Sequence, residues 1–139
     1  MNRNEMIKMY NEFIKKHNLK PEDLVIGAGS GLLLYGLREK TNDIDCDVNN
    51  ENYQTFKSIG IPKVYDLDKL PSIEIDDFSI HLKTDDIEIT IIDGVCTYTV
   101  KELLKQKLYL YEKYKDSMDR NKDLVDIKKL KEYLKNYKD

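Results

Sequence analysis

The sequence contains little of what marks a secreted or a membrane protein. It has only two cysteines in 139 residues, which is too few for the disulfide framework of a small secreted domain. Both cysteines stand in apolar, strand-like contexts, which indicates reduced and buried thiols. No apolar run approaches the length that crosses a membrane, and the N-terminal segment is amphipathic rather than a signal sequence. We therefore expect a cytoplasmic protein with no membrane partner.

An excess of positive charge is also missing. The chain has 23 Lys and Arg residues against 26 Asp and Glu residues, for a net charge of −3. The two signs are interspersed, so no global basic field attracts nucleic acid, although a local lysine-rich face could do so. Charged residues make up 35% and hydrophobic residues 40% of the chain. This composition and length fit one globular domain over residues 1–139.

Glycine is scarce, and half of it is concentrated in one place. Of six glycines, three fall between Gly27 and Gly31. Glycine loses the most entropy on folding, so the cluster indicates a tight turn or a close approach of a ligand to the backbone. An apolar strand over residues 24–26 leads into this turn, and a helix over residues 32–37 follows it. The N-terminus of such a helix favours anions, although an ordinary strand-to-helix turn is the simpler explanation of this stretch taken alone.

Carboxylates alternate with apolar residues shortly afterwards. Asp43, Asp45 and Asp47 are separated by Ile44 and Cys46, and a strand places alternate side chains on opposite faces. All three acids therefore line one face of the strand. Like charges this close are unfavourable unless a cation lies among them. Carboxylate oxygens suit hard divalent metals, so the pattern indicates Mg²⁺.

Helical spacing and turn signals indicate the remaining elements. Thr99 and Glu102 form a capping-box pattern that opens a helix. Two charged residues interrupt apolar patterns. Glu88 lies in a predicted strand, where exposure to solvent is the simpler explanation, and Lys107 lies in a helical stripe, from which its stem could reach water. The predicted elements are helices over residues 4–18, 50–58, 99–115 and 123–137, a strand over 63–65 and a β meander over 73–92, with a break near 118–121.

Two sets of motifs stand out when the pieces are combined. Gly29-Ser30, a helix and then Thr41-Asn42-Asp43-Ile44-Asp45 have the form hG[GS] followed by Dh[DE]h. Residues 103–108, which include Lys107, and residues 120–127 have the form LxxxK…RxKDxxD[IL]. With these motifs the chain resembles the nucleotidyltransferase superfamily that shares the DNA polymerase β fold, and most closely its small AbiEii-toxin-type and lincosamide-type members. Ala28 stands where many relatives have glycine.

The resemblance implies an α+β fold, the minimal nucleotidyltransferase fold. We expect a small mixed β-sheet that carries the acids, flanking helices, and a C-terminal helical pair over about residues 99–137. The implied activity is metal-dependent transfer of a nucleoside monophosphate from an NTP, such as ATP, to a hydroxyl acceptor. Two Mg²⁺ ions roughly 3.5–4 Å apart would assist this transfer. Asp43, Asp45 and a third carboxylate would bind them, with Glu88 as the best match for the third and Asp86 and Asp93 as alternatives.

Further roles follow from the same resemblance. Gly29 and Ser30 would hold the β- and γ-phosphates, and Lys107 would reach the triphosphate. Glu88, on a strand next to the aspartates, would bind the second ion or accept the proton of the hydroxyl. The acceptor is RNA, protein or a small molecule. The small size of the chain and the lack of a separate acceptor domain favour a toxin or antiviral-type effector, with an antitoxin or another protein as a possible partner, over a drug-modifying enzyme.

Two other interpretations stay open. The chain could be a catalytically inactive relative, kept as a nucleotide-binding or interaction module. It could also be a truncated Rossmann-type dinucleotide-binding protein, because Gly27 and Gly29 fit G-x-G-x-x-G. Leu32 occupies the third glycine position of that motif, and a meander does not fit the alternating parallel units that a Rossmann fold needs.

Overall fold

The acid-bearing strand β2 (Ile44–Val48) lies in the middle of one mixed sheet. The computed structural model describes residues 1–63, 71–83, 87–116 and 121–137. In these ranges seven strands form the sheet, in the order β3-β4-β5-β2-β1-β7-β6. The other strands are β1 (Val25–Ile26), β3 (Ile61–Lys63), β4 (Ser72–Ile75), β5 (Phe78–Leu82), β6 (Ile89–Ile92) and β7 (Val95–Tyr98).

Two parallel pairings hold the centre of this sheet together. β2 runs parallel to β5 and β1 runs parallel to β7, whereas β1 and β2 are antiparallel. The outer pairs β3–β4, β4–β5 and β6–β7 are antiparallel. The expected α+β fold with a small mixed sheet is therefore confirmed.

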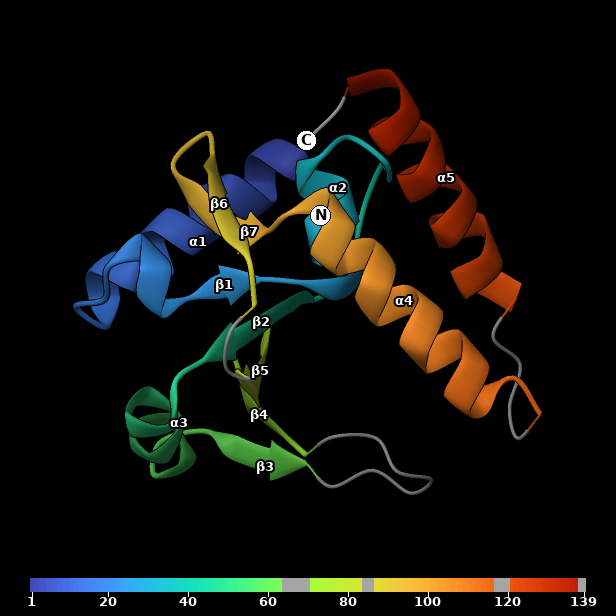
Figure 1. Cartoon of the computed structure of the whole chain (residues 1–139). Coiled ribbons are helices and arrows are strands. Elements are labelled where there is room, and N and C mark those ends of the chain that lie inside the picture. Colours follow the sequence, from blue (N-terminus) through green and yellow to red (C-terminus); the bar gives the residue numbers. More distant parts are fainter. Residues whose placement is uncertain (64–70, 84–86, 117–120, 138–139) are drawn as a thin grey trace.

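Helices cover both faces of the sheet (Figure 1). α4 and α5 form the expected C-terminal pair, which lies on the opposite side of the central strands from α1 (Figure 1). In the described ranges no helix has the length and apolar character to span a bilayer. The helices are α1 (Arg3–Lys16), α2 (Ala28–Leu34), α3 (Asn50–Lys57), α4 (Val100–Tyr114) and α5 (Asn121–Tyr137), with a short 3₁₀ turn η1 (Pro21–Asp23).

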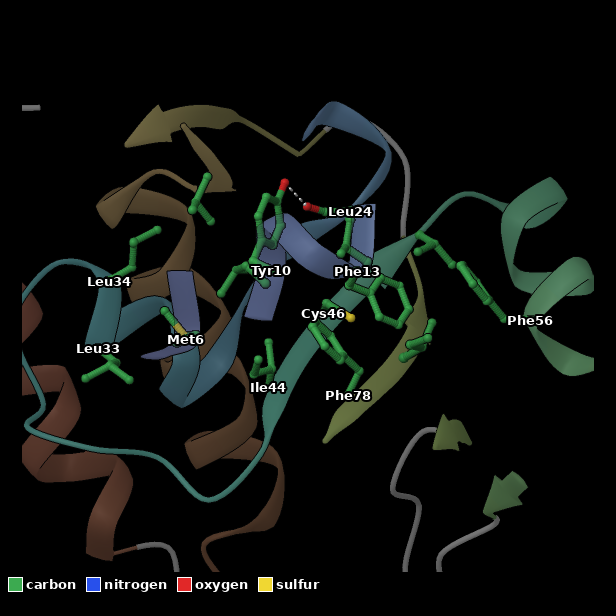
Figure 2. Close-up of a cluster of buried hydrophobic side chains, with 14 of the residues drawn as sticks. Met6, Tyr10, Phe13, Leu24, Leu33, Leu34, Ile44, Cys46, Phe56 and Phe78 are labelled. Carbon is green, nitrogen blue, oxygen red and sulfur yellow. Dashed lines mark hydrogen bonds between the residues drawn. The ribbon is translucent and has the colours of Figure 1, made fainter. Parts of the chain in front are cut away.

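The main core lies between α1, α3 and one face of the sheet. Met6, Tyr10 and Phe13 of α1 pack on Ile44 and Cys46 of β2 (Figure 2). The opposite face of the sheet contacts α2, α4 and α5 through a second cluster that includes Leu32, Leu103 and Leu130. The alternation of β2 thus buries its apolar residues against α1 and turns its aspartates toward α4.

Local sequence signals placed several elements correctly. The predicted N-terminal helix corresponds to α1, the helix over 50–58 to α3, and the helix opened by Thr99 to α4, where the Thr99 side chain accepts the N–H of Glu102. Both cysteines are buried free thiols, as expected. Burial raises the pKa of the Cys96 thiol to about 11, so this thiol stays protonated near neutral pH.

Other predictions about the elements need correction. α2 begins at Ala28 rather than at Leu32, since the N–H of Gly31 already donates to the carbonyl of Gly27. The short strand covers Ile61–Lys63 instead of 63–65, of which residues 64 and 65 lie outside the described ranges. Strand β7 was not predicted, and α5 begins at residue 121. Of the predicted break, residues 118–120 lie outside the described ranges.

The predicted meander over residues 73–92 is wrong in its topology. β4 and β5 form a hairpin, but β6 does not pair with β5 and instead lies at the far edge of the sheet beside β7. The reason is burial. Phe78 and Ile80 of β5 lie in register with Ile44 and Cys46 of β2, so the parallel pairing extends the apolar face that α1 covers.

Tyr10 links three segments of the core through its hydroxyl group. The hydroxyl donates to the carbonyls of Leu24, at 2.9 Å (Figure 2), and Pro21, at 3.0 Å, and it accepts the N–H of Cys96 at 3.3 Å. The side chain is fully buried. Its hydrogen bonds therefore fix α1 against the entry to β1 and against β7, the two strands that border the aspartates on one side.

We predict that Tyr10→Phe lowers the free energy of unfolding by about 1–3 kcal/mol, because it leaves buried backbone groups unpaired. Urea denaturation followed by circular dichroism measures the change. Tyr137→Phe is the matched control, since Tyr137 is 68% exposed. Equal stability of the two variants would contradict the role assigned to the Tyr10 hydroxyl.

Candidate functional site

The site is built on the polar face of β2. Ile44, Cys46 and Val48 are buried, whereas Asp45 and Asp47 are partly exposed, as the alternation predicts. Asp43 precedes the first residue of the strand and is exposed. The structure therefore brings the three acids to one side of the sheet.

Ser30 of α2 fixes the backbone of Asp43 and Asp45. Its hydroxyl donates to the carbonyl of Asp43 at 3.1 Å and accepts the N–H of Asp45 at 3.0 Å. The side chain is completely buried. The N–H of Gly27 adds a third link, donating to the carbonyl of Asp45 at 3.0 Å. The Ser30 hydroxyl, expected to hold phosphate, thus contacts the backbone of the acid strand as both donor and acceptor.

Two cavities lie side by side in front of these acids. The smaller, about 370 Å³, is lined by Arg38, Lys40 and Lys107 together with Asp43, and we call it the polar cavity. The larger, about 410 Å³, has mostly apolar walls, and we call it the apolar cavity. The residues that line the apolar cavity include Asp47, His81, Leu82, Ile87, Gln106, Tyr109 and Leu110. Asp45 and Ala28 line both cavities.

Crowding and burial perturb the aspartates. Burial, together with the neighbouring Asp43 and Asp47, raises the pKa of Asp45 from 3.8 to about 6, against the opposing effects of His81 and Lys107. Burial also raises the pKa of Asp47, although its hydrogen bond from the Tyr98 hydroxyl opposes that shift. Ionising Asp45 is therefore costly until a cation lies beside it.

The backbone at the junction of the two cavities is strained. Ala28 has a φ of +49°, in the left-handed region that favours glycine. It stands directly at the start of α2, where many members of the resembled family have glycine. A non-glycine residue held there indicates that the surrounding contacts, among them the Gly27 bond to Asp45, dictate the path of the chain.

The structure does not bring Glu88 together with Asp43 and Asp45. Glu88 is exposed and precedes β6, which is separated from β2 by β1 and β7. Asp93 is no substitute, because it follows β6 and pairs with Arg3 at 2.6 Å. Asp86 lies outside the described residues. The expected position of Glu88 on a strand adjacent to the aspartates is therefore wrong.

The strand that does lie beside the acids is β5. Its register places Ser79 opposite Asp45 and His81 opposite Asp47, so both share the face of the aspartates. His81 lines the apolar cavity. The sequence did not identify His81 as a residue of the site. The alternation of residues 78–82 predicted its face, but no local signal identified β2 as the neighbouring strand.

Lys107 reaches the site as expected, but it does not extend into water. Its ammonium group lies 3.2 Å from Asp123 and 3.1 Å from Asp126 of α5, and its side chain is only 12% exposed. It lines the polar cavity together with Gly29 and Arg38. Gly29, Lys107, Asp43 and Asp45, which are distant in sequence, therefore line one cavity.

The donor set suits a magnesium ion that arrives with a nucleotide. Among the described residues no three His, Cys, Asp or Glu side chains converge as a preformed metal cluster. Mg²⁺ typically uses only one or two protein carboxylates and completes its shell with water and substrate phosphates. Asp43 and Asp45 offer hard oxygen ligands. Burial raises the pKa of Asp45, so a cation bound beside it would offset the cost of its ionisation.

We predict that Ser30→Ala lowers the free energy of unfolding by about 1–3 kcal/mol, because the N–H of Asp45 loses its partner. Thermal or chemical unfolding measures this loss. Ser58→Ala is the control, since the Ser58 hydroxyl bonds the Thr55 carbonyl at an exposed position. A stability unchanged from the wild type would contradict the role of Ser30 as the link between α2 and β2.

Asp45→Asn should raise the free energy of unfolding, and the size of this increase should depend on pH. The folded-state pKa of about 6 exceeds the unfolded value of 3.8, so the wild type loses stability as pH rises between these values. Above pH 6, without metal, we expect the variant to be more stable by about 3 kcal/mol, and the gain should vanish below pH 4. Urea denaturation at pH 8 and pH 4 measures it, with Glu132→Gln as an exposed control; equal effects at both pH values would contradict the shift.

The comparisons with known proteins support the fold. No family model matches the sequence, and no curated protein matches it. A solved structure, described as the crystal structure of ANT(2")-Ia in complex with adenylyl-2"-tobramycin, matches with a TM-score of 0.61 and 16% sequence identity. The match covers 94% of this chain and 88% of that chain. This chain therefore has a nucleotidyltransferase-like fold.

Proposed function

We propose that this protein is a nucleotidyltransferase, which transfers a nucleoside monophosphate from an NTP to a hydroxyl group. The observation that carries the proposal is the position of Asp45, which lines both the polar and the apolar cavity. A transfer at an α-phosphate needs a binding site for the leaving pyrophosphate on one side and a site for the attacking hydroxyl on the other. The two cavities supply such an arrangement around one carboxylate.

The polar cavity is the proposed site of the triphosphate. Arg38, Lys40 and Lys107 provide three positive side chains in a volume of about 370 Å³, and cations arranged in advance stabilise the charge that develops on leaving phosphate groups. Gly29 contributes backbone at the same wall. Ser30 takes the role of a positioning residue in this proposal, because its hydroxyl holds the backbone of Asp43 and Asp45.

Asp43 and Asp45 would hold Mg²⁺, and we propose them as the metal ligands. Bound there, the ion would neutralise phosphate oxygens and polarise the α-phosphate. The protein would supply the rest. Ser30 holds the backbone of both aspartates, and burial of Asp45 favours its pairing with a cation. The number of ions, expected from the resemblance to be two, stays a prediction.

The reaction itself is a displacement at the α-phosphorus. The acceptor oxygen forms a bond to phosphorus, the bond to the β-phosphate oxygen breaks, and pyrophosphate leaves into the polar cavity. Asp47 and His81 line only the apolar cavity and therefore face the acceptor. Asp47, whose carboxylate the buried Tyr98 hydroxyl holds, is our candidate to receive the proton of the acceptor hydroxyl. This role replaces the one expected of Glu88.

The nature of the acceptor stays a prediction, and the size of the chain no longer favours a toxin or antiviral-type effector. The match covers 88% of the ANT(2")-Ia chain, whose structure contains an adenylylated aminoglycoside. A chain of similar fold and extent thus binds a small-molecule product. The apolar cavity, about 410 Å³ in volume and with Tyr109 and Leu110 in its wall, has a size that suits a small-molecule acceptor.

A catalytically inactive nucleotide-binding module is the second candidate. One observation favours it: β5 carries Ser79 and His81, and no carboxylate, on the face it shares with Asp45 and Asp47. The two candidates differ in one measurement. Release of pyrophosphate in the presence of labelled NTP and a panel of tRNA, protein, aminoglycoside and lincosamide acceptors supports the enzyme, and tight NTP binding without any release supports the module.

We expect the double variant Asp43→Ala and Asp45→Ala to lose Mg²⁺-dependent NTP binding while it stays folded, because both proposed ligands are gone. Isothermal titration with Mg²⁺ and a non-hydrolysable NTP measures binding, and circular dichroism checks the fold. Glu132→Gln, at an exposed position of α5, serves as the control. Undiminished Mg²⁺-dependent binding by the double variant would overturn the proposal.

A further inference from the structure

A buried group of charged side chains lies behind the polar cavity. Two cations contact the same carboxylate oxygen, Oδ2 of Asp126 in α5. Arg38 Nη2 lies 2.7 Å from it and Lys107 Nζ lies 3.1 Å from it. Lys107 also contacts Asp123 Oδ1 at 3.2 Å. Arg38 comes from the loop after α2, Lys107 from α4 and both aspartates from α5. One carboxylate oxygen therefore connects three separate parts of the chain.

The exposure of the group is asymmetric. The side chains of Asp126 and Asp123 are 5% and 7% exposed, whereas that of Arg38 is 31% exposed. Both cations line the polar cavity, and neither aspartate does. Seen from the cavity, the carboxylates thus lie behind the two cations.

Stability alone does not account for such an arrangement. Taking charges out of water costs free energy that their attraction repays only in part, and apolar residues of similar volume often serve as well or better. The arrangement has a clear use if the cations must stand at fixed positions. A carboxylate behind each cation limits its rotamers and lowers the entropy lost when the cation binds an anion.

Gly29 leaves room for the guanidinium group of Arg38. A Cβ atom at this position would lie 2.4 Å from Arg38 Nη1 and 3.0 Å from Arg38 Cζ. The guanidinium group thus lies directly against the backbone at the start of α2. The glycine cluster predicted a tight turn or the close approach of a ligand to the backbone. At Gly29 the group that approaches the backbone is the side chain of Arg38.

We propose that Arg38 is a further binding residue for the β- and γ-phosphates, and that Asp126 is the positioning residue that holds Arg38 beside Lys107 for this purpose. This inference rests on the proposed function. One N–H of the Arg38 guanidinium bonds Asp126, and the group has five donors in a planar fork that suits phosphate oxygens. Asp126 acts through the two cations and contacts no phosphate.

The proposal predicts selective loss of affinity for the outer phosphates. Asp126→Asn keeps the shape of the side chain but removes the charge that both cations share. We expect it to weaken binding of Mg²⁺–ATP by about tenfold or more, as for the loss of a charge-assisted hydrogen bond, and to change AMP binding little. Arg38→Ala should give the same pattern, and the two changes together should weaken ATP binding by less than the product of the single effects.

Isothermal titration of the full-length protein with ATP and AMP tests these expectations. Glu132→Gln on α5 and Lys105→Ala on α4 are matched controls, because Lys105 is 79% exposed and pairs only loosely with Glu102, at 3.8 Å. Arg38→Lys, which keeps the charge but not the fork, should recover part of the ATP affinity. Arg38→Ala removes a partly exposed side chain and serves as the second variant if Asp126→Asn does not fold.

The outcomes separate this inference from the proposed function. If the wild type binds no Mg²⁺–ATP at all, both fall together. If the wild type binds it and the folded Asp126→Asn and Arg38→Ala variants keep the same ratio of ATP to AMP affinity, the roles of Asp126 and Arg38 are overturned and the proposed function stands. A lower melting temperature of Asp126→Asn with an unchanged affinity ratio would assign the group a structural role only, and would equally overturn the proposal.

Discussion

The geometry of the site depends on one hydroxyl group, that of Ser30. β2 begins at Ile44, so the backbone at its start requires partners that β1 does not supply. Ser30 provides them by donating to the carbonyl of Asp43 and accepting the N–H of Asp45. Because Ser30 is the third residue of α2, the helix and the acids form one unit. Any displacement of α2 therefore moves both the acids and the wall of Gly29 that the polar cavity shares with them.

The negative charge of the acids on β2 is partly offset by Lys107, a residue far away in the sequence. Burial raises the pKa of Asp45, and the neighbouring charges of Asp43 and Asp47 add to this effect. Lys107 opposes it from α4, but its own charge is shared with Asp123 and Asp126. In the free protein these charges are therefore only partly neutralised. A cation near Asp45 and an anion near Lys107 would each be favoured. A metal–triphosphate pair offers both at once, which is why we favour it over either ion alone.

Local patterns in the sequence predicted the parts of the site that local forces determine. The period of two in residues 43–48 placed Asp45 and Asp47 on one face, and the capping residue Thr99 placed the start of α4. Lys107 stood out because it interrupts an apolar helical stripe, and Asp123 and Asp126 hold it there. The α+β fold and the mixed sheet followed from the same signals combined with the resemblance.

Pairings between distant strands were not predictable in this way. Glu88 appeared to be near the acids because the order of the chain suggests a meander, but the parallel pairing of β2 with β5 brings His81 there instead. That pairing follows from the burial of Phe78 and Ile80 against α1, a contact between segments more than sixty residues apart. Arg38 was missed for a similar reason, since its partner Asp126 lies 88 residues further along the chain.

The position of α4 connects the two halves of the proposed site. Lys107 lines the polar cavity, while its helix neighbours Gln106, Tyr109 and Leu110 line the apolar one. Because these residues follow one another within about one helical turn, a rigid shift of α4 changes both cavities together. The contacts of Lys107 with Asp123 and Asp126 tie α4 to α5. The charged group behind the proposed phosphate site therefore also fixes the wall against which an acceptor would bind. In the proposed function, phosphate affinity and acceptor selectivity would thus depend on the same contacts.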